Sequence, residues 1–308
     1  MAEYQNQSGE LQRRAGMAVA LVFTLLSISR AADTPPATDP AKSGLDSTTV
    51  LAARDRATVE RNVRTFVNAI AVKPGDESLA RWQPQIPLCP LVAGMPNSDG
   101  EYVLSRISKI ATAAGAPLAP AHCKGNFYII VTSDPEGVIK AWMKRDVRMF
   151  GDETDQGSTK IREFSAASPV RVWYNTDFYN LDGTPLGNNG GSNADGRTNL
   201  SARATKIEIN NYRALSSVIT IVDTRRVKDV SYGQVAAYVG MVGLAQIRPK
   251  ANVSEAPSIL NLFAGAGKAP PGLTAWDEAF LKAVYGTRIT DRGQLAAIKT
   301  AMVQDVAP

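Results

Sequence analysis

The chain of 308 residues is 44% hydrophobic and 20% charged, with 34 Lys and Arg against 29 Asp and Glu and a single histidine, His122. The apolar fraction excludes general disorder, and 24 glycines and 18 prolines without a fixed period exclude a collagen-like fibre. One histidine excludes most zinc and haem sites, and a net charge of only +5 without a run of Lys and Arg argues against nucleic-acid binding.

Residues 1–31 have the pattern of a secretory signal peptide. Arg13 and Arg14 precede an apolar run of 14 residues at 15–28, and the small residues of Ser29-Arg30-Ala31 follow where a signal peptidase cuts. An uncleaved membrane anchor is the alternative, although a spanning helix needs about 20 apolar residues. We therefore expect a bacterial protein exported by the Sec route to the periplasm or the medium, which touches a membrane only if the leader stays on.

The two cysteines, Cys89 and Cys123, suffice for one bridge in an oxidising compartment. Such a bridge would close a long loop and stabilise the fold by about 3–4 kcal/mol in the chain-entropy model. Two free buried thiols are the alternative, and a thiol nucleophile would have only His122 as its base. We expect a structural disulfide between Cys89 and Cys123.

Composition divides the rest of the chain into a linker and one folded part. Residues 32–47 are rich in Pro, Ser and Asp and show no periodicity, which predicts a disordered linker. The remainder, 48–308, is expected to form a single α/β domain, a mixed sheet with flanking helices. We treat it in two parts, 48–150 and 151–308.

The first part has the order of a βαβ-like unit. Apolar periodicity and turn residues predict a helix at 59–70, an extended segment at 82–91, a helix at 102–114, a strand at 126–132 and a helix at 138–150. The extended segment, the second helix and the strand form the unit, and the expected disulfide joins the chain on either side of that helix.

The second part is expected to continue the sheet and then turn helical. Its pattern predicts strands at 170–174, 205–212 and 217–223, helices at 232–246, 274–286 and from Thr290 onward, and an apolar segment at 258–263. Apolar residues nearly encircle the helix at 232–246, so we expect it to be buried between layers. Thr274 and Asp277 have the spacing of a capping box. The Gly- and Asn-rich loop at 181–201 is either a plain insertion or a ligand lid.

Five phrases of the sequence resemble an uncharacterised family of exported proteobacterial proteins: Cys89-Pro-Leu-Val-Ala-Gly94, Cys123-Lys-Gly-Asn126, Tyr238-Val-Gly-Met-Val-Gly-Leu-Ala-Gln246, Ser258-Ile-Leu-Asn-Leu-Phe263 and Leu273-Thr-Ala-Trp-Asp-Glu-Ala-Phe-Leu281. That family has no established activity. Its C-terminal half in turn resembles the zincin metalloproteases, whose active helix carries His-Glu-x-x-His-x-x-Gly-Leu. Aligning Gly243-Leu244 with that Gly-Leu puts Ala236 and Ala237 at the first His and the Glu, and Gly240 at the second His.

Zinc hydrolysis needs two imidazoles one helical turn apart and a carboxylate that takes the proton of the water. Alanine and glycine supply neither. The resemblance therefore implies a zincin-like C-terminal half without the catalyst, with no metal, no cofactor and no catalytic residue. It also implies a cleft along 232–246 beside the strand 217–223, since zincins hold substrate against an edge strand above that helix. The alternative is that 232–246 is a core helix of small residues.

Other groups of residues that could have a functional role also have purely structural explanations. Asp223 and Asp229 could form a carboxylate pair for acid–base work or cap loops. The acidic residues at 152–155 lack the Gly and distal Glu of an EF-hand loop. The aromatic residues Trp173, Tyr174, Phe178 and Tyr179 could pack in the core or form a platform for a carbohydrate or peptide.

Most of these features are explained by the hypothesis that the protein is a pseudo-enzyme, a noncatalytic binding or scaffold domain of the bacterial envelope. Its partner would be an envelope protein, a peptide or a glycan, and not a nucleic acid. One alternative is a hydrolase that uses carboxylates or an atypical metal site, and another is a purely structural envelope protein.

Overall fold

The computed structural model describes residues 43–72, 79–150, 158–185, 211–248, 250–265, 269–288 and 293–307. The chain divides into two compact units, Met1–Ser47 and Thr48–Pro308, and the sheet with its covering helices belongs to the second. The expected signal peptide at 1–31 lies outside the described residues, as do residues 32–42 of the expected linker, most of the loop at 181–201 and most of the strand at 205–212.

A four-stranded mixed sheet forms the centre of the second unit. Its strands are β1 (Pro90–Ala93), β2 (Phe127–Thr132), β3 (Val170–Asn180) and β4 (Asn211–Asp223), in the order β1-β2-β4-β3. The first three in that order run parallel, and β3 pairs with β4 antiparallel. The expected mixed α/β fold with flanking helices is confirmed. The strands expected at 205–212 and 217–223 are not separate, because the described residues from 211 to 223 stay paired with β3 as one strand.

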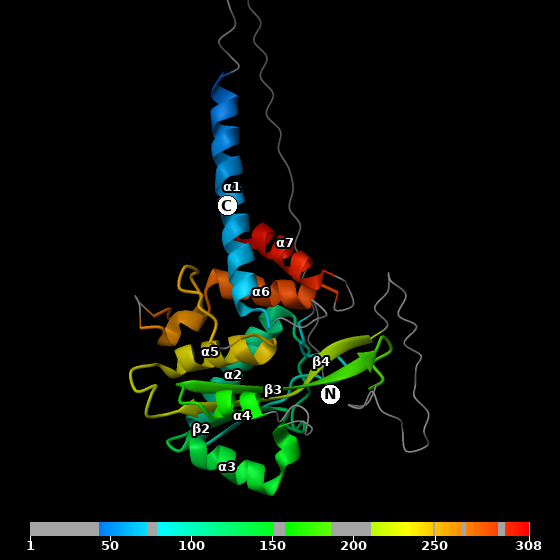
Figure 1. Cartoon of the computed structure of the whole chain (residues 1–308), viewed down its shortest axis with the longest axis vertical. Helices are drawn as coiled ribbons and strands as arrows, with labels where there is room; N and C mark the ends of the chain where they lie inside the picture. The colour runs from blue at the N-terminus through cyan, green and yellow to red at the C-terminus, as the bar shows by residue number, and fades with distance from the viewer. Residues whose placement is uncertain are drawn as a thin grey trace, which may run out of the picture. The chain divides into compact units, whose positions relative to one another are not determined.

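Helices cover both faces of this sheet. α2 (Asn97–Ala114), α5 (Tyr232–Leu244) and α6 (Ala275–Gly286) lie above it in Figure 1, and α3 (Pro135–Arg145) lies below. The 3₁₀ helix η1 (Val147–Phe150) and α4 (Ser158–Ser165) pack on the same side as α3. The helix expected at 138–150 is therefore two pieces, because it ends at Arg145 and resumes as η1.

The side chains of β4 alternate between two hydrophobic cores. Val218 and Val222 belong to the large core under α2 and α5, whereas Ile219 and Ile221 face α3 and α4. All four are at most 1% exposed. Burial on both faces explains why this strand is a continuous apolar run and not an alternating one.

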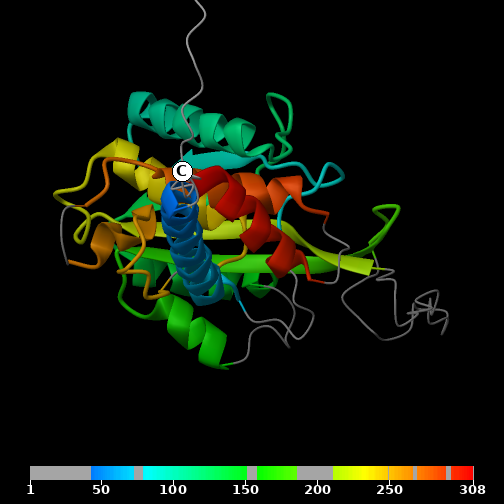
Figure 2. The same ribbon diagram turned by 90° about the horizontal axis from the view of Figure 1, so that it is seen from above.

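The expected βαβ-like unit is present as β1, α2 and β2, with α2 alongside β1 and α5 (Figure 2). Gly115 ends α2 in the left-handed conformation, with φ of 79°, which glycine adopts without strain. Cys89 stands just before β1 and Cys123 between α2 and β2. The two are joined in a disulfide, with Cα atoms 6.1 Å apart, so the predicted pairing is confirmed.

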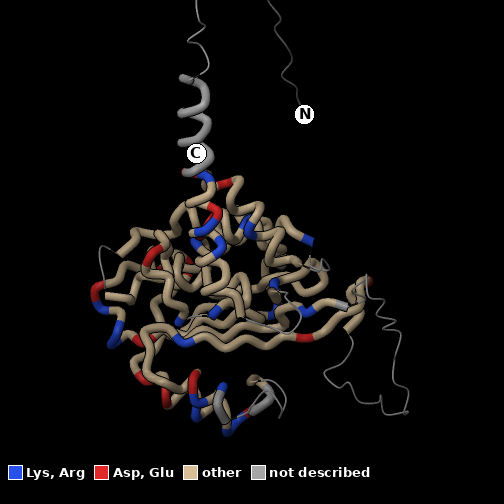
Figure 3. Tube along the Cα trace, turned by 45° about the horizontal axis from the view of Figure 1, so that its top comes forward, with Lys and Arg blue, Asp and Glu red and all other residues tan. Residues whose placement is uncertain are grey.

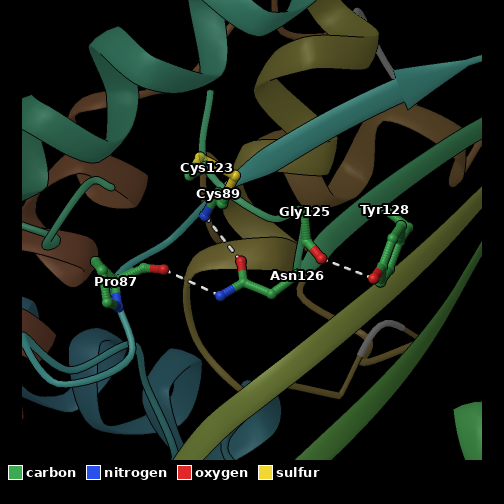
Figure 4. Close-up of a disulfide and its surroundings, with 6 residues drawn as sticks. All are labelled: Pro87, Cys89, Cys123, Gly125, Asn126 and Tyr128. Atoms are coloured by element: carbon green, nitrogen blue, oxygen red, sulfur yellow. Dashed lines mark hydrogen bonds between the residues drawn. A yellow bond between two sulfur atoms is a disulfide. The ribbon is translucent and has the colours of Figure 1, made fainter. Parts of the chain in front are cut away.

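Asn126 holds the chain around this disulfide, as Figure 4 shows. Its side-chain oxygen accepts a hydrogen bond from the backbone N–H of Cys89 at 2.8 Å, and its amide donates to the carbonyl of Pro87 at 3.0 Å. The Tyr128 hydroxyl donates to the carbonyl of Gly125 at 2.7 Å. The covalent bridge and these hydrogen bonds together fix the start of β1 against the start of β2.

Three further elements complete the large core together with α6: α1 (Ser43–Ile70), the 3₁₀ helix η2 (Ile259–Phe263) and α7 (Gln294–Val306). α1 contains the helix expected at 59–70 but begins at Ser43, inside the expected linker. Phe66 of α1 meets Trp276 and Phe280 of α6 edge-on, with ring centroids 5.8 and 6.1 Å apart.

α6 begins with the predicted capping box. The Thr274 side chain accepts a hydrogen bond from the N–H of Asp277, and the Asp277 carboxylate accepts from the N–H of Thr274 at 2.9 Å. The same carboxylate accepts from the Ser258 hydroxyl at 2.6 Å and from the N–H of Ile259 at 2.8 Å. Asp277 therefore joins η2 to α6 as well as starting the helix.

Candidate functional site

The small residues of α5 lie inside the large core. Ser231 caps the helix in a capping box with Gln234, and every residue from Val235 to Leu244 is buried. Ala236 is 0% exposed and Ala237 is 1% exposed. The expectation of a buried helix is confirmed.

Close packing explains why these positions are small. A Cβ added at Gly240 would lie 3.1 Å from Cδ1 of Ile110 in α2, and one added at Gly243 would overlap the ring of Phe127 in β2. Both contacts are tighter than ordinary van der Waals distance, so α5 can approach α2 and β2 only with glycine there. Ile110 fills the space over Gly240 where the resemblance places a histidine.

Strand 217–223 is not the edge strand that the resemblance implies, because β4 is an interior strand that pairs with both β2 and β3. Among the described residues, no group of three or more His, Cys, Asp and Glu side chains is arranged to hold a metal ion. His122 is exposed and lies in the turn next to Cys123, with φ of 61°.

The structure pairs Asp223 with arginines and not with Asp229. Its buried carboxylate at the end of β4 accepts hydrogen bonds from Nε and Nη2 of Arg225, both at 3.0 Å, and Arg226 lies 3.5 Å away. Arg225 holds the pKa of Asp223 below its ordinary value through these hydrogen bonds. Asp229 is exposed.

Glu136 of α3 joins the cluster by accepting hydrogen bonds from Arg171 and, at 3.3 Å, from Arg225. Carboxylates neutralised in this way are poor general bases.

The aromatic residues of β3 separate onto the two faces of the sheet, as the two-residue period of a strand requires. Trp173 packs against Phe150 in the core under α3 and α4, with centroids 5.5 Å apart. The Tyr174 hydroxyl donates to the carbonyl of Val242 in α5 at 2.7 Å, and burial raises its pKa. Tyr179 stacks on Tyr212 of β4 at 5.9 Å. These side chains do not form one platform.

A cavity of about 540 Å³ runs along the free edge of β3, and we call it the edge groove. Its lining includes five consecutive residues of β3, a wall from α4 and a wall from the chain after α5: Val72, Lys160, Glu163, Phe164, Ser168, Val170, Arg171, Val172, Trp173, Tyr174, Gln246, Ile247, Arg248 and Lys250. The groove borders the chain that follows α5 and the antiparallel edge strand β3.

The backbone of β3 presents unpaired peptide groups to the edge groove. The N–H of Asp223 donates to the carbonyl of Pro169 at 2.9 Å, which sets the alternation of the β3–β4 ladder. That alternation turns the N–H and C=O groups of Val172 and Tyr174 away from β4. No described residue hydrogen-bonds to them on this side.

The lining of the edge groove is basic. Lys160, Arg171, Arg248 and Lys250 outnumber a single carboxylate, Glu163. Arg171 pairs with Glu136, whereas Arg248 donates only to backbone carbonyls, at 2.9 Å to Ala71 and 3.2 Å to Asn68. Elsewhere on the described chain basic and acidic residues are interspersed (Figure 3).

No protein-family model, curated protein or solved structure matches this chain. None of the helices in the described ranges combines the length and the apolar character needed to cross a bilayer. We therefore infer the function from the geometry of the edge groove.

Proposed function

We propose that this chain is an exported protein of the bacterial envelope whose disulfide-bonded α/β domain binds an extended peptide segment of a partner protein without cleaving it. The peptide would lie in the edge groove and add a fifth strand to the sheet beside β3. The single observation that carries this proposal is the row of unpaired peptide groups of Val172 and Tyr174 along a walled groove.

An open sheet edge is a template for another strand, and proteins commonly shield such edges. Here no strand within the described residues pairs with the outer edge of β3, which lines the groove together with α4. A strand paired with β3 would lie about 4.8 Å from it and would place alternate side chains toward α4 and toward residues 246–248. Main-chain hydrogen bonds would supply affinity, and the two walls would supply selectivity.

The resemblance to zincins supports the same site. In zincins the substrate lies against an edge strand next to the active helix, and here Tyr174 ties the edge strand to α5 through Val242. Ala236, Ala237 and Gly240 offer no metal ligand and no base, which favours binding over hydrolysis. The pattern of residues 1–31 and the disulfide support export.

A hydrolase that uses carboxylates has less support. Asp223 and Glu136 are the carboxylates that come together, and arginines occupy both. Neither residue lines the edge groove.

The proposal is tested by a proline substitution that removes one outward N–H. Peptides selected from a random eight-residue phage library on the mature chain would be measured by isothermal titration calorimetry against the wild type, Val172→Pro and Val172→Thr. Proline is tolerated on edge strands, so Val172→Pro should fold but bind about tenfold more weakly, because it loses a hydrogen bond and inserts its ring into the groove. Val172→Thr keeps the N–H and the branched shape and should bind like the wild type.

Two results would count against the proposal. One is a library that yields no binding peptide, and the other is a folded Val172→Pro variant with wild-type affinity. Cleavage of the selected peptide, followed by mass spectrometry, would instead revive the hydrolase.

A further inference from the structure

A second hollow lies between α2, α6 and the first half of α5, and we call it the helical pocket. Its volume is about 450 Å³, within the range of cavities that hold small molecules. Its lining shares no residue with the edge groove: Arg106, Lys109, Ile110, Ala113, Ala114, Ala237, Pro271, Gly272, Leu273, Glu278, Leu281 and Lys282.

The floor of the helical pocket is apolar and made largely of small side chains. Ala114, Ala237 and Leu281 are 7%, 1% and 1% exposed, and Ile110 is partly buried beside them. The space exists because the side chains that α2 and α5 contribute to the lining include the small residues Ala114 and Ala237. No polar side chain belongs to this floor, so a ligand would contact it through an apolar group.

Three cations stand on the rim of the helical pocket. Arg106 and Lys109 are three residues apart on α2, so they occupy neighbouring positions on one helix face, and Lys282 belongs to α6. Glu278 is the only acidic residue of the lining. Within the described ranges none of the three cations forms an ion pair, not even Lys282 with Glu278 one turn away. With three cations and one carboxylate, the lining keeps a net positive charge above an apolar floor.

The helical pocket continues into a shallower hollow that shares Arg106 and Pro271 with it. Two tyrosines border this hollow, Tyr102 of α2 and Tyr232 at the start of α5, and they are 47% and 48% exposed. Exposed rings of this size add apolar contact surface beside the cations.

We propose that the helical pocket binds an amphiphilic organic anion, in which an apolar chain or ring carries a carboxylate or a phosphate. The anionic group would lie among Arg106, Lys109 and Lys282, and the apolar part would cover Ala237 and Leu281. A strongly hydrated polyanion would leave that floor unused, and a cationic amphiphile would meet the wrong charge. This site is independent of peptide binding in the edge groove.

The test uses the purified mature chain with decanoate, decyl phosphate and decyltrimethylammonium as probes, measured by calorimetry below their micelle concentrations. Binding of at least one anion and not of the cation is expected. The two anions distinguish carboxylate from phosphate chemistry. Comparable binding of decyltrimethylammonium, or no binding of either anion, would overturn the proposal.

Substitutions locate the site. Lys109→Gln and Lys282→Gln should each weaken anion binding about two- to fivefold, and the triple variant that adds Arg106→Gln should weaken it more than tenfold. Ala113→Trp, at an exposed position of the lining, should fill the pocket and abolish binding. Lys140→Gln on α3, across the sheet, is the matched control and should have no effect. Wild-type affinity in the triple variant would overturn the proposal even if Ala113→Trp fails to fold.

Discussion

Single residues set the distances in this fold, and the glycines of α5 are the sharpest case. In the zincin alignment, Gly240 marks the loss of a metal ligand. In the structure, Gly240 and Gly243 permit α2 and β2 to approach the helix. Close packing alone accounts for glycine at both positions.

Gly243→Ala should destabilise the protein by about 1–3 kcal/mol, because the new methyl group would overlap the ring of Phe127 and overpack the core. Gly240→Ala should cost less, since the nearest atom is the flexible end of Ile110. Gly286→Ala, which has no atom within 4 Å of the added Cβ, is the control and should be neutral or slightly stabilising. Urea unfolding followed by circular dichroism checks the series. Equal midpoints for the three variants would contradict the packing explanation.

The roles of some residues could be predicted from their neighbours in the sequence, whereas the roles of others depend on distant residues. Thr274 and Asp277 could be identified as a capping box, and Gly115 as a helix end, because those signals depend on neighbours along the chain. The contact of Gly243 with Phe127 depends on a residue more than a hundred positions away. For the same reason the pairing of Asp223 with Glu136 through arginines could not be foreseen.

At the scale of elements, the cluster at the end of β4 connects three of them. Asp223 belongs to β4, Glu136 to α3 and Arg171 to β3, and Arg225 from the following turn completes the network. Because the cluster is charged, the stability of the contact between β4 and α3 should depend on pH.

Asp223→Asn should cost about 1 kcal/mol at pH 7, a modest value because Arg225 is 54% exposed and solvent screens the pair. The pKa of Asp223 lies below its ordinary 3.8 in the fold, so its contribution is complete above pH 3.8 and is lost as the pH falls through the lowered value. The difference in the free energy of unfolding between wild type and variant should therefore shrink at pH 2.5. Urea unfolding at both pH values provides the measurement.

Asp277 acts in the opposite direction, since burial raises its pKa. It is present in wild type and variant alike, so it cancels from the comparison. A difference that stays constant between pH 7 and pH 2.5 would show that Asp223 stabilises the fold by shape and not by charge.

Periodicity identified most elements but not their neighbours. The βαβ-like unit could be predicted because its strands, helix and turns follow one another in the sequence. Which strand lies at the edge could not, since the order β1-β2-β4-β3 depends on pairing between distant segments. Periodicity alone therefore does not show that β4 is interior and that β1 and β3 lie at the two edges.

For the molecule as a whole, two hollows of different chemistry lie in one disulfide-bonded unit. The edge groove offers unpaired backbone and a basic lining, and the helical pocket offers an apolar floor under three cations. Basic residues outnumber acidic ones in the lining of both hollows, and such a lining attracts anionic groups. Neither hollow could be found from the sequence, because residues of at least three separate segments of the chain line each of them.

Amide hydrogen exchange of β3, measured by NMR with and without a selected peptide, shows whether a peptide pairs with this strand. Exchange at Val172 should slow at least about tenfold on binding, because its outward N–H would pair with the peptide, and so should exchange at Tyr174. Arg171 and Trp173, whose N–H groups already face β4, should change little. Unchanged exchange at Val172 and Tyr174 in the saturated complex would show that the peptide lies elsewhere and would contradict the account.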